Sequence, residues 1–155
     1  MGGRLTFAVV LACVGVTLVP MLARANRDEQ SLTLRLGAVH APLALEVGAA
    51  YTRGLSELVA LELAGGLGHG TEGTYGVATG GVRIALDVLT WVPSLAGTVG
   101  GCVASGEGAR ALSEVRAGVR RYLSFDWSVG MDVGVRFVRR ASPQLIAHAE
   151  LGRHF

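Results

Sequence analysis

The chain has 155 residues, the length of a single domain, and half of them are hydrophobic while only 17% are charged. Its 14 basic residues are all arginine, and against 12 carboxylates they give a formal net charge of +2. No basic patch is interleaved with aromatic residues, so we expect no nucleic-acid partner. In a strand-rich chain, 23 glycines suggest bends, tight turns and small positions that face the interior.

The first segment, residues 1–25, is interpreted as a secretory signal peptide. Arg4 supplies the positive charge, residues 5–22 form an apolar run, and Ala23-Arg24-Ala25 has the A-x-A cleavage pattern. An uncleaved membrane anchor is the alternative, although the cleavage pattern favours processing. The mature domain then spans 26–155. Its only cysteine is Cys102, which excludes an internal disulfide.

We predict that export removes residues 1–25, because the apolar run ends at a site for signal peptidase. N-terminal sequencing of protein purified from membranes is expected to begin at Asn26. A mature form that retains Met1 would contradict the prediction, and so would one that starts at Cys13, as a lipoprotein would.

Eight segments of alternating apolar and polar residues follow. In 128–138, Val129, Met131 and Val133 alternate with small or charged residues, and this period of two predicts a β-strand. A tilted strand of about 9–11 residues spans a bilayer. Residues 88–106 carry no charge and could instead form a membrane helix, but their proline and glycines favour a turn and a strand. The predicted strands span 31–40, 43–52, 58–68, 78–89, 94–105, 111–122, 128–138 and 144–155.

Charged residues lie opposite the apolar stripe on nearly every predicted strand. A membrane β-barrel places its apolar face outward and its polar face in the lumen. We therefore predict an all-β fold, an eight-stranded antiparallel up-and-down transmembrane β-barrel, with a soluble barrel or sandwich as the alternative. The lumen of so small a barrel is just wide enough for side chains, so we expect these to pair and plug it: Arg35, Glu46, Glu62, Arg83, Asp87, Glu114, Arg116, Arg120, Asp132, Arg136, His148 and Glu150.

Aromatic residues gather near one end of the predicted strands. Amphipathic rings of this kind form girdles at the membrane–water interface. If the chain starts on the periplasmic side, one rim carries Tyr51, Trp91, Tyr122, Phe125, Trp127 and Phe155.

Two patterns suggest chemistry, and both have simpler interpretations. Residues 68–73 match G-x-G-x-x-G, but the glycine-rich residues that follow are a poor helix, so we expect a loop and not a phosphate site. His148 and Glu150 could act as a base and its orienting carboxylate. No serine is evidently positioned beside them, so we favour a lumen ion pair and expect no enzyme. The histidines are scattered, and we expect no metal or cofactor.

The last segment ends in Phe155, preceded by the alternating Leu151, Ala149, Ala147 and Leu145. This ending resembles the C-terminal signal of bacterial outer-membrane barrels, although Arg153 stands where an aromatic residue is frequent. The mature chain resembles the small OmpA/OmpX/OmpW-like barrels along almost its whole length.

The resemblance implies a location in the bacterial outer membrane, contact with its lipid, and insertion by the barrel-assembly machinery, which would recognise Phe155. Members include structural proteins, narrow channels and lipid-modifying enzymes. We therefore expect a structural or surface-interaction role, with a narrow channel for small solutes as the alternative and a lipid-active enzyme as a less favoured one. A monomer is expected.

Overall fold

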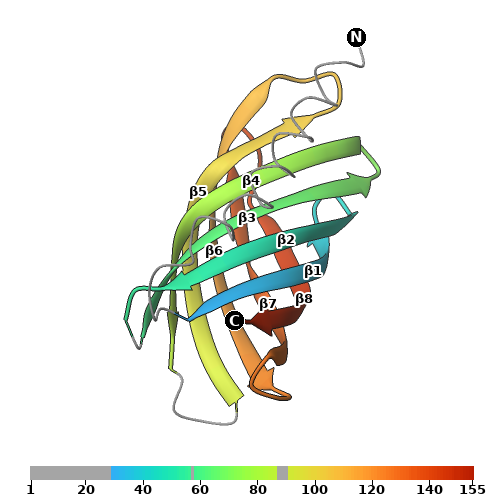
Figure 1. The fold of residues 1–155 in the computed structure, drawn as a ribbon. Helices are drawn as coiled ribbons and strands as arrows, with labels where there is room; N and C mark the ends of the chain where they lie inside the picture. The colour runs from blue at the N-terminus through green and yellow to red at the C-terminus, as the bar shows by residue number, and fades with distance from the viewer. Residues whose placement is uncertain (1–28, 57, 87–90) are drawn as a thin grey trace.

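The computed structural model describes residues 29–56, 58–86 and 91–155, and the expected signal peptide lies outside them. Eight strands form one closed barrel, each antiparallel to the next, with β8 pairing back to β1 (Figure 1). The predicted eight-stranded up-and-down barrel is confirmed. The strands are β1 (Gln30–His40), β2 (Ala44–Gly54), β3 (Val59–Gly70), β4 (Gly73–Ala85), β5 (Trp91–Ala104), β6 (Ala109–Tyr122), β7 (Trp127–Val138) and β8 (Gln144–His154).

Along the middle of the strands, most apolar side chains are exposed and the charged side chains are buried. On β1, Leu34 and Leu36 are exposed while Arg35 between them is buried, and on β7 the same relation holds for Val133 and Asp132. Soluble proteins have the opposite arrangement, so this is a transmembrane β-barrel. In the part of the chain that the structure describes, no helix is long and apolar enough to cross a membrane.

The β3–β4 hairpin differs from the prediction. The predicted strands 58–68 and 78–89 left residues 69–77 as a loop, which is wrong: β3 continues to Gly70 and β4 begins at Gly73, so the turn is short. Glycines weakened the alternating pattern there, but paired neighbours on both sides keep a glycine-rich segment extended. The G-x-G-x-x-G segment is therefore this hairpin. β5 likewise starts at Trp91, three residues before the predicted start.

Two glycines leave room for lumen side chains that extend over the inner face of the neighbouring strand. Gly134 pairs with Arg116, and a Cβ at Gly134 would collide with the Arg116 side chain and the Val115 carbonyl. Gly37 pairs with His148, and a Cβ there would collide with the imidazole. Glycine at both positions gives the long side chains room to reach the middle of the lumen.

Both described chain ends lie at one end of the barrel, which we call the terminal rim. The opposite end, the hairpin rim, carries the turns between β1 and β2, β3 and β4, β5 and β6, and β7 and β8. On the terminal rim, Trp91, Phe125, Trp127 and Phe155 are exposed, as a girdle requires.

The girdle prediction is wrong for Tyr122. This residue occupies an inward-facing position of β6, packs against His154 with ring centroids 4.8 Å apart, and donates a hydrogen bond of 3.2 Å to Glu29. Tyr51 lies at the same rim but is buried, and it donates a hydrogen bond to Gln30, so it does not have the exposure expected of a girdle residue. Tyr122 thus belongs to the lumen entrance and not to the lipid interface.

Candidate functional site

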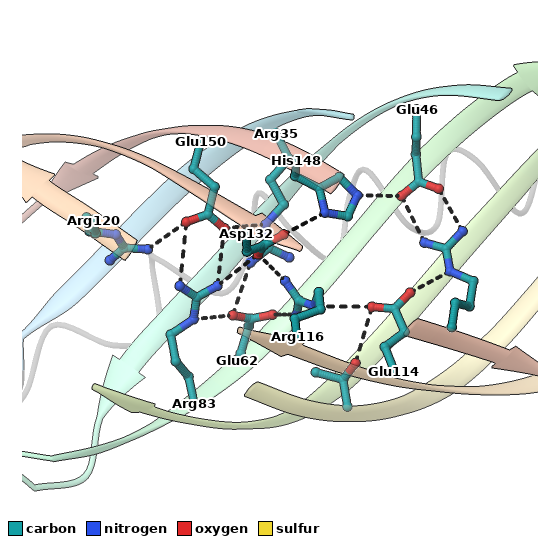
Figure 2. A network of polar contacts seen from close by, with 12 residues as sticks. Arg35, Glu46, Glu62, Arg83, Glu114, Arg116, Arg120, Asp132, His148 and Glu150 are labelled. Carbon is teal, nitrogen blue, oxygen red and sulfur yellow. Dashed lines mark hydrogen bonds and ion pairs between the residues drawn. The ribbon is translucent and has the colours of Figure 1, made fainter. Parts of the chain in front are cut away.

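The charged residues singled out in the sequence lie inside the barrel and contact one another (Figure 2). Asp87 lies outside the described residues. The others come from seven different strands, and nearly all are buried. We call this set the lumen network: Arg35, Glu46, Glu62, Arg83, Glu114, Arg116, Arg120, Asp132, Arg136, His148 and Glu150.

Glu62 is the centre of the network. Its fully buried carboxylate accepts hydrogen bonds from three guanidinium groups: Arg35 at 3.1 Å, Arg83 at 2.8 Å, and Arg116. A single carboxylate thereby joins β1, β3, β4 and β6. An isolated carboxylate at this depth would be strongly destabilising, and the surrounding positive charges offset its desolvation.

Glu150 forms a second branch toward the terminal rim. Its carboxylate pairs with Arg35 at 2.9 Å, Arg83 at 3.1 Å and Arg120 at 3.3 Å. Arg35 and Arg83 each bridge Glu150 and Glu62, so the two branches are continuous. The shared arginines hold β1, β3, β4 and β8 together across the lumen.

Arg136 organises the branch toward the hairpin rim. Its guanidinium donates to both carboxylate oxygens of Glu46, at 2.8 and 3.1 Å, and to Glu114 at 2.7 Å. The Tyr75 hydroxyl donates to Glu46 at 3.0 Å, and the Thr98 hydroxyl donates to Glu114 at 3.4 Å. Paired hydrogen bonds of this geometry are the strong form of an arginine–carboxylate contact.

His148 connects the branches but does not pair with Glu150. One ring nitrogen lies 2.9 Å from Asp132 and the other lies 3.6 Å from Glu46. Asp132 in turn accepts a hydrogen bond of 2.9 Å from Arg116. Glu150 is occupied by arginines, so the structure does not assemble the base and carboxylate pair that the sequence suggested.

Cavities adjoin the network on its hairpin-rim side. A vestibule of about 420 Å³ is lined by Val39, Tyr75, Cys102, Arg136 and Val138, among others. A void of about 20 Å³, room for one water molecule, lies deeper, beside Gly48, Gly65, Arg136 and His148. The vestibule reaches down to Arg136, where the network begins. Within the described residues, no group of three or more histidine, cysteine or acidic side chains could hold a metal ion.

A second polar cluster, which could not be predicted from the sequence, lies at the terminal rim. Ser128 Oγ is 2.8 Å from His154 Nε2, and His154 Nδ1 is 3.2 Å from the Glu29 carboxylate. The imidazole, together with the Tyr122 hydroxyl, holds the pKa of Glu29 below its ordinary value. The serine, the imidazole and the carboxylate lie side by side in that order, as in the Ser–His–Asp triad of hydrolases. Ser128 is 0% exposed, however, so a substrate could not reach its hydroxyl in this arrangement.

No protein-family model matches the sequence, and no curated protein matches it either. Solved structures do match. The N-terminal β-barrel domain of Pseudomonas aeruginosa OprF is 12% identical with a TM-score of 0.70, over 82% of this chain and 97% of that one. Neisserial surface protein A is 9% identical with a TM-score of 0.57, over 82% and 95%.

Ail, the attachment invasion locus protein of Yersinia pestis, is 12% identical with a TM-score of 0.56, over 84% of this chain and all of that one. The chain has the fold of the bacterial eight-stranded outer-membrane β-barrels. A de novo designed transmembrane β-barrel also matches, at 12% identity and a TM-score of 0.53. Since a designed barrel matches as well, the likeness concerns architecture and not a shared activity.

Proposed function

We propose that the protein is a bacterial outer-membrane barrel with a structural or surface-interaction role, and that its lumen network closes the barrel to solutes. The network carries the proposal, because five arginines, five carboxylates and His148 meet across the middle of the lumen. The outer surface is apolar, which suits lipid. Two of the structural neighbours, named as a surface protein and an attachment protein, support a role at the cell surface.

The energetics of buried charge support a closed lumen. An ion that passed Glu62 would have to separate it from three guanidinium groups at once. Removing one partner from a buried ion pair costs about 3–5 kcal/mol, and here several pairs would open together. A catalytic role has less support, because no nucleophilic side chain belongs to the network.

Conductance across planar bilayers tests the closed lumen. The refolded protein is expected to show no steady conductance, and Arg116→Ala is expected to make it leaky, because removal of that side chain opens a gap beside Glu62. Arg110→Ala is the matched control, since among the residues that the structure describes Arg110 forms an ion pair with exposed Glu107 alone, near the hairpin rim.

The alternative is a narrow channel, which the vestibule and the deeper void favour. A large steady conductance of the unmutated protein, unchanged by Arg116→Ala, would establish the channel and refute the closed lumen. Location is tested separately: the protein should fractionate with the outer membrane and migrate differently on gels before and after heating.

Phe155 is expected to promote assembly. Its backbone N–H donates to the Gln30 carbonyl at 3.0 Å and its own carbonyl accepts from Gln30 at 3.3 Å, while its ring is exposed. Phe155→Ala keeps the backbone and removes only the ring. We predict that this substitution lowers the amount of inserted barrel in cells, because the assembly machinery would recognise the terminal ring.

Phe155→Tyr, which keeps an aromatic ring, is the control and should insert normally. Purified Phe155→Ala should refold in detergent almost as well as the unmutated protein, because no assembly machinery acts there. Equal insertion of Phe155→Ala and unmutated protein in cells would refute the recognition role and leave the barrel unaffected.

A further inference from the structure

We propose that two tryptophan–arginine pairs on the terminal rim form a binding site for the phosphate groups of anionic phospholipids. The proposal rests on the membrane location proposed above. It adds a preference among lipids, which an apolar surface alone does not provide.

The sheet register builds both pairs in the same way. Trp91 at the start of β5 lies directly across from Arg121 at the end of β6, and the guanidinium carbon is 5.3 Å from the ring centroid. Trp127 at the start of β7 lies directly across from Arg153 at the end of β8, at 5.9 Å. β6 and β7 are neighbouring strands (Figure 1), so the register places the two pairs next to each other along the terminal rim.

All four side chains point outward, at the depth where lipid headgroups meet the barrel. Trp91 is 51% exposed and Trp127 is 42% exposed, and Phe125 on the turn between β6 and β7 is 98% exposed. Tryptophan at a barrel rim sits in the interfacial layer of the bilayer. The guanidinium groups beside the indole rings therefore lie level with lipid phosphates.

Neither guanidinium is neutralised by a carboxylate within the described residues. The lumen arginines are all paired, and Arg110 at the hairpin rim pairs with Glu107 at 2.9 Å, but no ion pair joins Arg121 or Arg153 to nearby Asp126. The cation–π contact with the indole ring helps to hold each guanidinium in place before a ligand arrives. A guanidinium fork matches the oxygens of a phosphate group in paired hydrogen bonds.

Charge favours anionic over zwitterionic lipid. Two neighbouring positive charges attract a net negative headgroup, whereas the ammonium of phosphatidylcholine is repelled by the same charges. The expected ligand is therefore a phospholipid such as phosphatidylglycerol in the leaflet that surrounds the terminal rim.

The chain contains two tryptophans, and both belong to this site, so intrinsic fluorescence reports on it directly. The protein is reconstituted in phosphatidylcholine vesicles that contain a small fraction of lipid brominated high in the acyl chain, either phosphatidylglycerol or phosphatidylcholine. We expect brominated phosphatidylglycerol to be enriched at the tryptophans roughly fivefold or more over brominated phosphatidylcholine, and the preference to fall with added salt.

Arg121→Gln combined with Arg153→Gln should abolish the preference while both lipids still quench. The matched control is Arg139→Gln with Arg140→Gln, which removes two charges from the turn at the hairpin rim and should leave the preference intact. Heat-dependent gel migration verifies that each variant is folded. If a glutamine variant does not fold, the unmutated protein still tests the proposal. Its quenching by the two brominated lipids is then compared at low and high salt.

Equal quenching of the unmutated protein by the two lipids would overturn the proposed site and leave the membrane location standing. A preference that survives in the Arg121→Gln and Arg153→Gln variant would also overturn it. Absence of quenching by either lipid would mean that the tryptophans do not face lipid, and it would overturn the membrane location together with the site.

Discussion

Replacing Arg116 with alanine is expected to destabilise the folded barrel by about 3–5 kcal/mol. The side chain is only 1% exposed and contacts Glu62, Asp132 at 2.9 Å and Glu114 at 3.4 Å. Its removal leaves three buried carboxylates with fewer partners in the interior of the barrel. Urea-induced unfolding in lipid vesicles, followed by tryptophan fluorescence, measures the change in the free energy of unfolding.

Arg110→Ala provides the matched control for this measurement. Arg110 pairs with Glu107 at 2.9 Å, but both side chains are more than 40% exposed, so the loss should be about 1 kcal/mol or less. Similar losses for the two variants would show that the lumen is wet enough to solvate Glu62, and would argue against a closed barrel.

Val133→Arg is the second substitution with a large expected effect. Val133 lies midway along β7 on the outer face and is 59% exposed. A guanidinium there would enter the hydrocarbon of the bilayer, at an expected cost of about 2–4 kcal/mol near the midplane. The same unfolding measurement in vesicles detects it.

Val129→Arg places the identical side chain on the same face of β7 but close to the terminal rim. Because the penalty falls to about 0–1 kcal/mol near the interface, this variant should remain nearly as stable as the unmutated protein. Equal stability of the Val133→Arg and Val129→Arg variants would mean that the apolar face is not in hydrocarbon.

The alternation of residue types was enough to predict the barrel and the direction of its side chains. Val133 and Asp132 are neighbours of opposite character, and only a strand places them on opposite faces. Sequence could not predict which charges meet. Arg136 and Glu46 lie on β7 and β2, which are not adjacent in the sheet, and they touch only because the lumen is narrow enough for them to reach across.

Strand ends and rim residues were harder to predict, for local reasons. Tyr75 stands among glycines and threonines in a segment interpreted as a loop, yet it reaches Glu46 inside the barrel. Tyr122 was expected to face lipid because it is aromatic and near a strand end, but its position in the register of β6 turns it inward. His154 meets Ser128 and Glu29 because β8 lies between β7 and β1, and this proximity follows from closure of the sheet.

The pairing of Arg35 has a consequence for how the barrel folds. Arg35 binds Glu62, 27 residues away, and Glu150, 115 residues away. The nearer contact needs only the first three strands, whereas the farther one requires β8 to have joined β1. Arg136 shows the same division between Glu114, 22 residues away, and Glu46, 90 residues away. Contacts between residues so distant in the chain form slowly, because closing a long loop costs conformational entropy before the contact can stabilise the fold. We therefore expect the local pairs to form first and the long-range pairs to form late, when β8 joins β1 and closes the barrel.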